Sequence, residues 1–183
     1  MSPQIKAALI AGSVGVLTLI GTLAAQFYGI RRTSKDTLNA RFATAADKLG
    51  SEAPAVRLAG VYAMAGLADD WPENRQTCVD VLCAYLRLPY DPDPDEDSDP
   101  AGRAAYRANR EVRHTVIRVI TAHLKDDAPV SWQGLNFDFT GVIFDGGDFT
   151  GAEFSGGAVS FVGTEFSGGE VSFRGAQFSG PSK

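Results

Sequence analysis

The C-terminal part of the chain, residues 130–180, carries a hydrophobic pattern with a period of five. Written in fives it reads FDFTG, VIFDG, GDFTG and AEFSG, then VSFVG, TEFSG, VSFRG and AQFSG, with two-residue insertions at 157–158 and 169–170. A period of five fits neither an α-helix nor an alternating strand. It predicts a solenoid that turns a corner every five residues, with Gly at each corner and Phe pointing into a core built by stacked turns. The predicted core is Phe139, Phe144, Phe149, Phe154, Phe161, Phe166, Phe173 and Phe178.

The N-terminal residues 7–30 form an uncharged, mostly apolar stretch. As a helix, it is long enough to cross the roughly 30 Å hydrocarbon core of a bilayer. Arg31, Arg32 and Lys35 follow it directly. This positive flank predicts a single-pass span with the C-terminal body in the cytoplasm. The alternative is a cleaved signal peptide that ends near Ala24.

Residues 31–87 show hydrophobic positions at helical spacing. We expect a first helix that continues the membrane span as a stalk and ends at Gly50. A second helix is expected to begin at Pro54 and a third after Trp71, because proline is favoured in the first turn of a helix. The segment is therefore predicted to be a helical stalk followed by a helix pair.

An acidic, proline-rich segment at residues 88–100 interrupts the helical pattern, and we expect it to be a solvated linker. Its first aspartates alternate as in a calcium-binding loop. However, Glu96 stands where such a loop needs Gly, and Gly102 stands where it needs Glu. Calcium binding is therefore not predicted.

A fourth helix is predicted over residues 101–127, where it would cap the first turn of the solenoid. One face of this helix is basic. The acidic linker and the anionic membrane surface are the partners that we expect for this face. Nucleic acid is the weaker alternative, because Tyr106 is the only aromatic residue beside the basic side chains. The basic stripe consists of Arg103, Arg107, Arg110 and Arg118.

The overall composition gives little sign of chemistry. A net charge of −5 and a pI near 5.0 do not favour nucleic-acid binding. Cys78 and Cys83 match no zinc or redox spacing, and their helical context predicts buried thiols without a disulfide. His114 and His123 are nine residues apart, so they do not share a helix face as ligands. We therefore predict no catalytic, cofactor-binding or metal-binding residues, and a protein that is not an enzyme.

The repeats resemble the pentapeptide-repeat family, whose fold is a right-handed quadrilateral β-helix with four faces per coil. The preceding segments, 41–68 and 79–87, are similar to the helical part of membrane-anchored pentapeptide-repeat proteins, where paired helices resemble a HEAT-like array. The resemblance implies an α+β chain with an N-terminal transmembrane helix, a helical middle and a short C-terminal β-helix. It supplies no catalytic residue.

These patterns predict a membrane-tethered scaffold that presents its helical and repeat surface to a cytoplasmic protein or to itself. The alternative is a DNA-mimicking topoisomerase binder, since some pentapeptide-repeat proteins protect gyrase in this way. Mimicry needs a long, negatively charged rod, whereas these repeats make only about two coils with few acidic residues. We also expect a homo-oligomer, because nothing in the sequence covers the last aromatic layer of Phe166, Phe173 and Phe178.

Overall fold

The computed structural model describes residues 35–90 and 100–180. The predicted membrane span at residues 7–30 and the part of the predicted linker at residues 91–99 lie outside this described part. The helices that the structure does describe include none that is both long enough and apolar enough to cross a membrane.

The chain divides into a unit of residues 1–40 and a compact unit of residues 41–183. A helix over residues 35–49 crosses this division, and the other described helices belong to the compact unit. The helix α2 begins at Pro54, where the sequence predicted it, and a short 3-10 turn after Trp71 leads into α3. The bounds are α2 Pro54–Asp70, η1 Pro72–Asn74, α3 Arg75–Leu86 and α4 Pro100–His123.

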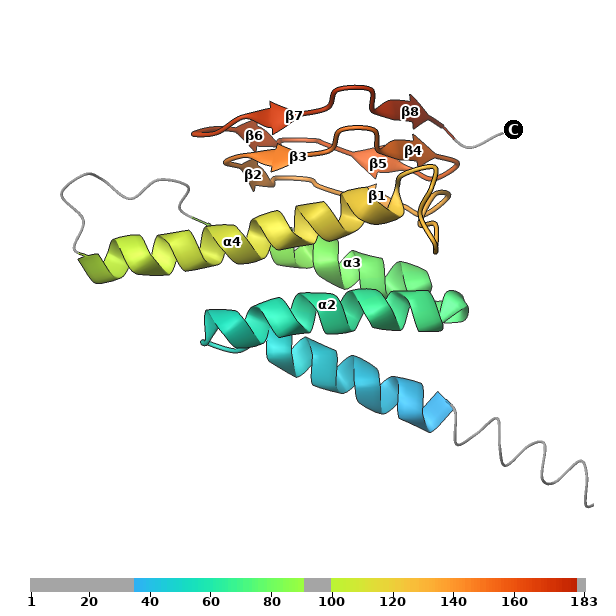
Figure 1. Ribbon diagram of the computed structural model, residues 1–183, viewed down its shortest axis with the longest axis horizontal. Helices are drawn as coiled ribbons and strands as arrows, with labels where there is room; N and C mark the ends of the chain where they lie inside the picture. The colour runs from blue at the N-terminus through green and yellow to red at the C-terminus, as the bar shows by residue number, and fades with distance from the viewer. Residues whose placement is uncertain (1–34, 91–99, 181–183) are drawn as a thin grey trace, which may run out of the picture. The chain divides into compact units, whose positions relative to one another are not determined.

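The repeats form two stacked coils, each with four short strands (Figure 1). Each strand of the first coil pairs in parallel with the strand four places later, so the described strands make four two-stranded sheets. Together with the helices, they give an α+β architecture. The strands are β1 Phe137–Asp138, β2 Ile143–Phe144, β3 Gly147–Asp148, β4 Glu153–Ser155, β5 Val159–Ser160, β6 Glu165–Phe166, β7 Val171–Ser172 and β8 Gln177–Ser179.

The two insertions in the repeat lie at corners where the coils approach closely. A Cβ atom added to Gly157 would lie 1.9 Å from the carbonyl oxygen of Leu135. At Gly169 the corresponding distance, to the carbonyl oxygen of Asp145, would be 2.2 Å. Only glycine allows this approach without moving the backbone. Glycine at the start of each insertion therefore lets the second coil stack closely on the first.

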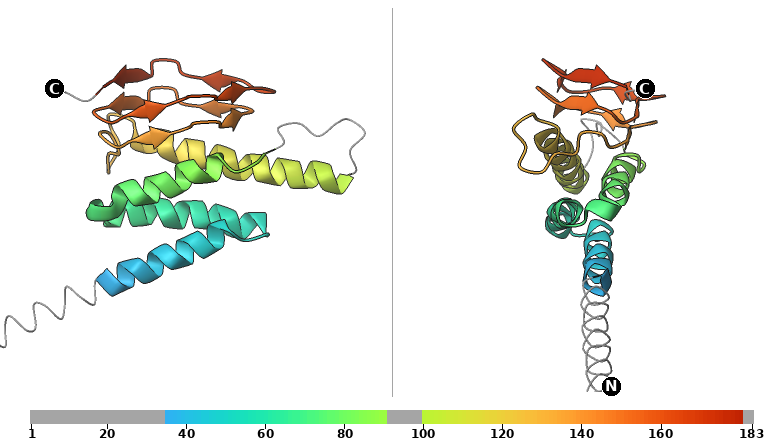
Figure 2. Two further views of the ribbon diagram at one scale, coloured as in Figure 1. Left: turned by 180° about the vertical axis from the view of Figure 1, so that it is seen from behind. Right: turned by 90° about the vertical axis from the view of Figure 1, so that its right-hand side faces the viewer.

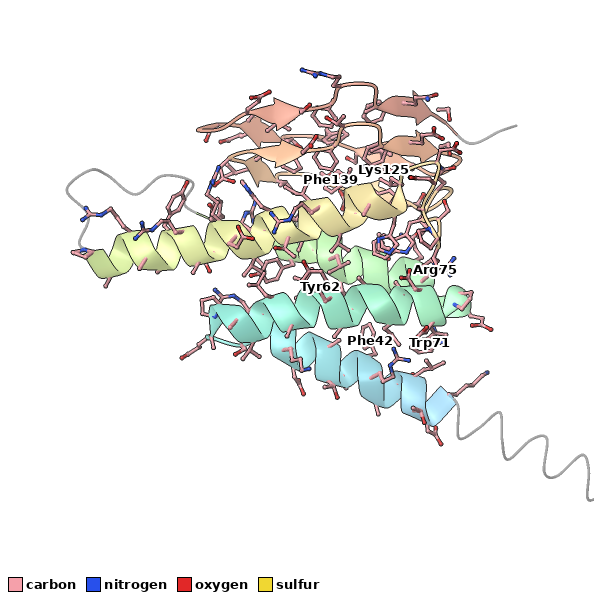
Figure 3. The ribbon with its side chains drawn as sticks, viewed as in Figure 1. Phe42, Tyr62, Trp71, Arg75, Lys125 and Phe139 are labelled. Carbon is pink, nitrogen blue, oxygen red and sulfur yellow. The ribbon has the colours of Figure 1, made fainter. Side chains whose placement is uncertain are left out.

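The predicted phenylalanine core is complete only in the first coil. Phe139, one of its four repeat phenylalanines, lies between the strands and α4 (Figure 3) and is fully buried. In the second coil Phe166 and Phe178 remain 55% and 54% exposed. Both residues belong to the last aromatic layer, for which the sequence offered no cover, and none of the described elements covers the outer face of the second coil. The buried rings are those of Phe139, Phe144, Phe149 and Phe154, and the partly covered rings are those of Phe161 and Phe173.

Two helices, and not only the predicted fourth one, cover the outer face of the first coil. Contacts join α3 to β1 and α4 to β3, and α2 packs against both α3 and α4. Figures 1 and 2 show α3 and α4 between the coils and α2. The apolar face of α4 supplies Val112, Val116 and Ile120 to the buried core. The helical body and the repeats thus share one continuous hydrophobic core.

Candidate functional site

The covered end of the repeat domain has its main-chain groups satisfied by the helices. A strand edge leaves N–H and C=O groups without partners unless another element supplies them. Here Arg113 donates to the carbonyl of Ile143 at 2.7 Å, and Thr121 donates to that of Asp148 at 2.9 Å. On the neighbouring faces, Arg87 donates to the carbonyl oxygen of Asp138 at 2.8 Å. The helices therefore act as a polar cap as well as an apolar cover.

The opposite end, formed by β5, β6, β7 and β8, has no such cover among the described residues. These strands pair only with the coil beneath them. Val162 is 71% exposed, and Phe166 and Phe178 are each more than half exposed. We call this surface the open end. It combines unpaired strand edges with bare aromatic rings, which is the usual character of an interaction surface.

The aromatic rings of the open end continue stacks that begin in the first coil. The rings of Phe154 and Phe178 lie 5.0 Å apart with an interplanar angle of 5°. The same values describe Phe149 and Phe173. Because each stack finishes with a ring face that no described residue covers, a further aromatic layer would continue the same packing.

A buried carboxylate, that of Asp145, joins the helical body to the repeats. Asp145 directly follows the core residue Phe144 and is only 2% exposed. It accepts hydrogen bonds from the Tyr90 hydroxyl at 2.6 Å and from Arg110 Nε at 3.1 Å. His114 Nε2 lies 3.0 Å from its other carboxylate oxygen. This network connects the chain after α3 and the middle of α4 to one corner of the first coil.

The protonation of this network follows from its geometry. Burial of Asp145 acts to raise the pKa of its carboxyl group, but the hydrogen bonds from Tyr90 and His114, together with the charges of His114 and Arg110, lower it below its usual value. Burial raises the pKa of Tyr90, and the adjacent Asp145 raises it further. Near neutral pH, Asp145 is therefore a carboxylate and Tyr90 a neutral donor. This arrangement suits a structural junction.

The predicted basic stripe does not act as one surface. Arg110 is directed onto Asp145 of the repeats. Arg118 forms an exposed ion pair with Glu111 at 2.6 Å on its own helix. Arg103 and Arg107 are exposed on the first half of α4. Contact of the stripe with lipid or with the acidic linker stays a prediction, since residues 91–99 lie outside the described part.

A second network, which the sequence did not reveal, surrounds Asp69 at the end of α2. Trp132 Nε1 donates to Asp69 Oδ1 at 2.9 Å, and His123 Nε2 lies 3.2 Å from the other oxygen. The His123 and Trp132 rings stack with centroids 4.0 Å apart. Asp69 is separated from these residues by 54 and 63 positions in the sequence. This network fixes the segment that leads from α4 into the first coil.

The remaining reactive residue types are placed as structural groups. Burial raises the pKa of Cys78 to about 11 and that of Cys83 to about 12, so both thiols stay protonated and unreactive near neutral pH. No group of three or more His, Cys, Asp or Glu residues in residues 35–90 and 100–180 is placed to hold a metal ion.

Comparison with known proteins gives one result for the repeats. A protein-family model described as pentapeptide repeats (9 copies) matches residues 139–182. A search of curated proteins and a search of solved structures each found no significant match. The stacked parallel strands agree with the match, and the C-terminal part of this chain is therefore a pentapeptide-repeat domain.

Proposed function

We propose that the protein is a non-enzymatic scaffold that is tethered to the membrane by residues 7–30 and associates through the open end of its repeat domain. The observation that carries this proposal is the contrast between the two ends of the coils. The helices cover one end completely, whereas the other exposes Phe166, Phe178 and Val162. The uncharged N-terminal stretch and the basic residues after it support a tether with the body on the cytoplasmic side.

The same proposal includes the finer description of the fold. Four sheets around two coils support a right-handed quadrilateral β-helix. The packing of α2 against α3 and α4 supports a HEAT-like arrangement of the helical body. In this view the helical body anchors the first coil, and the second coil presents the open end on the side opposite to the helices.

A second copy of the chain is the partner that we assign to the open end. An identical end offers the same aromatic layer, so it can continue the ring stacks of Phe154 with Phe178 and of Phe149 with Phe173. Its strand edges offer both donors and acceptors. Between the coils, Phe139 N donates to the second coil, and Glu165 N donates back to the first. A surface with both kinds of group is self-complementary, as a two-fold interface requires.

Cysteine crosslinking in native membranes tests this proposal. Ser179 lies in β8 and is exposed, so Ser179→Cys places a thiol on the open end. Cys78 and Cys83 can remain because both are buried. We expect a short thiol-specific crosslinker to give a covalent dimer with Ser179→Cys. The matched control is Ser131→Cys, which is exposed on the loop before the first coil, at the covered end.

The outcomes separate self-association from other arrangements. A dimer with Ser179→Cys but not with Ser131→Cys supports the proposal. Monomer in both variants contradicts self-association through this end. A crosslinked product of another size would show that a different protein covers the open end, and the assignment of a second copy would then be wrong.

A further inference from the structure

A small basic cavity lies on the helical body, away from the open end. It has a volume of about 270 Å³, is open to solvent on one side, and is lined by the turn before α2, the segment around the end of α3 and the middle of α4. Its polar lining includes Arg57, Tyr85, Asn109 and Arg113, and Leu88 contributes to its apolar side. Such a volume exceeds that of several water molecules, at roughly 30 Å³ each. It is slightly below the range of about 300 Å³ and more that is typical of ligand pockets.

The two arginines of this cavity have no carboxylate partner within the described part of the chain. Arg113 is only 5% exposed. Its guanidinium donates to the main-chain carbonyls of Leu86 and Ile143 and lies 4.1 Å from the centre of the Tyr90 ring. No ion pair of Arg113 is present among the described residues. The direct partners of this buried guanidinium are thus all neutral, and a carboxylate acts on its charge only without direct contact.

Arg57 has a similar environment on the other side of the cavity. Its Nη1 donates to the carbonyls of Ser51 and Glu52, each at 3.0 Å, and its Nη2 donates to Asn109 Oδ1 at 2.5 Å. Its Nε is shut off from solvent and has no acceptor in the described structure. Structures leave few buried donors unsatisfied, and such a donor commonly indicates a missing water or ion. Arg57 thus adds a second positive charge whose neighbours are all neutral acceptors.

Neighbouring hydroxyl groups suit the same kind of ligand. Tyr85 lines the cavity, and burial raises the pKa of its hydroxyl group, which therefore stays protonated and able to donate. The acidic side chains nearest to Arg113 act from a distance. Asp145, for example, interacts electrostatically with Arg113 but is hydrogen-bonded to Tyr90 and Arg110. The lining of the cavity itself contains no carboxylate.

We infer that this cavity binds a small oxyanion, one that carries a carboxylate or phosphate group, between Arg57 and Arg113. Guanidinium groups match the geometry of both of these anions and bind them by charge-assisted hydrogen bonds. The volume favours a small anion over a nucleotide. The inference does not depend on the scaffold proposal, because the cavity lies on the helices and the open end lies on the last coil.

Thermal unfolding of the full-length protein in mild detergent tests the inference. A ligand that binds only the folded state raises the unfolding midpoint with its concentration. Inorganic phosphate and acetate are the two probes, titrated separately while sodium chloride keeps the ionic strength constant. We expect a saturable rise with at least one of them. The stronger response identifies the preferred anion, phosphate or carboxylate.

The variant Asn109→Asp places a built-in carboxylate beside Arg57 without changing the size of the side chain. We expect it to raise the unfolding midpoint in the absence of probe and to weaken binding of the probe about tenfold or more. The matched control is Ser131→Asp, which adds the same charge on an exposed loop and should bind the probe as the natural chain does. The variant Leu88→Trp, at a 56% exposed position on the cavity wall, should also weaken binding without changing any charge.

Two results would overturn the inference. One is the absence of any midpoint rise beyond that of chloride at equal ionic strength, for phosphate and for acetate. The other is a rise that Asn109→Asp and Leu88→Trp leave unchanged, since the anion would then bind elsewhere. Neither result bears on crosslinking at Ser179, so failure of this inference and failure of the scaffold proposal are distinguishable.

Discussion

Phe154 and Phe178 provide a direct comparison between the two coils. They occupy the same place in successive turns, because the register of β4 and β8 pairs one with the other. Their rings form one stack. The first is 2% exposed and the second is 54% exposed. Changing each to Ala therefore removes the same atoms from the same place in the repeat. Phe154 is covered on both sides, whereas the outer side of Phe178 is exposed.

The expected losses of stability differ by roughly a factor of two. Phe154→Ala should lower the free energy of unfolding by about 3–5 kcal/mol, as is usual for a fully buried Phe that leaves a cavity. Full burial of a Phe side chain contributes roughly 1.5–3 kcal/mol, and Phe178 is only about half buried. With a ring stack of about 0.5–1.5 kcal/mol in addition, Phe178→Ala should lower the free energy of unfolding by about 1–3 kcal/mol.

Urea unfolding of the full-length protein in detergent, at low protein concentration, measures both losses. Trp132 is fully buried at the junction of α4 and the first coil, so its fluorescence reports unfolding of the shared core. Equal losses for Phe154→Ala and Phe178→Ala would refute the reasoning, because the second coil would then be as well covered as the first. If a second copy covers the open end, the loss from Phe178→Ala should increase at high protein concentration.

Two further predictions concern the corners of the coils. Because the pKa of Asp145 lies below its usual value, the carboxylate stabilises the fold above pH about 4, and this stabilisation is lost as the pH falls through the lowered value. Asp145→Asn should thus have a lower free energy of unfolding than the natural chain at pH 7, and this free energy should fall less between pH 7 and pH 3. Urea unfolding at several pH values measures it, and parallel pH profiles for the two proteins would contradict the prediction. Gly157→Ala should destabilise by several kcal/mol, because its Cβ atom would overlap the Leu135 carbonyl. In the control Gly66→Ala, the added Cβ atom meets no atom within 4 Å, so this variant should be neutral or stabilising by about 0.5–1 kcal/mol. Similar urea-unfolding midpoints for the two variants would show that the backbone at Gly157 can move to accept a side chain.

The repeat was predictable from the sequence because its signal is local. The phase of Phe and Gly within each five residues fixes which positions turn and which point inward, and the strands form where this phase places them. The helix starts at Pro54 and after Trp71 were predictable for the same reason, since proline acts on the backbone of its own turn. The α+β arrangement of helices followed by repeats also follows from local patterns.

The uncovered last layer, which includes Phe178, was predictable from the order of the repeats. The burial of a polar residue was not predictable in this way. Asp145 directly follows a core phenylalanine, and nothing in the repeat pattern marks its side chain as buried. It is buried because Tyr90, Arg110 and His114 reach it from positions 31 to 55 residues earlier in the chain. No periodicity reports a contact over such a separation.

The placement of basic residues illustrates the same limit and bears on function. By spacing alone, Arg110 belongs to an exposed stripe, whereas Arg113 lies on the apolar side and was not singled out. In the structure Arg110 pairs with Asp145, while Arg113 is buried without a carboxylate partner among the described residues. The fold thus pairs a carboxylate with an arginine that the sequence placed on an exposed stripe, and gives only neutral direct partners to an arginine that the sequence did not single out.

The two ends of the repeat domain show where folding leaves surface for interaction. At the covered end, Arg87 just after α3 and two side chains of α4 donate to the carbonyls of Asp138, Ile143 and Asp148. At the open end, the second coil gains stability only from the coil beneath it, and its outer rings remain in water. The second coil buries the aromatic rings of the first, since Phe173 stacks on Phe149 and Phe178 on Phe154, but its own outer rings are left for another partner. Self-association stays the proposal that this surface supports best, because a second copy would supply matching edges and rings together.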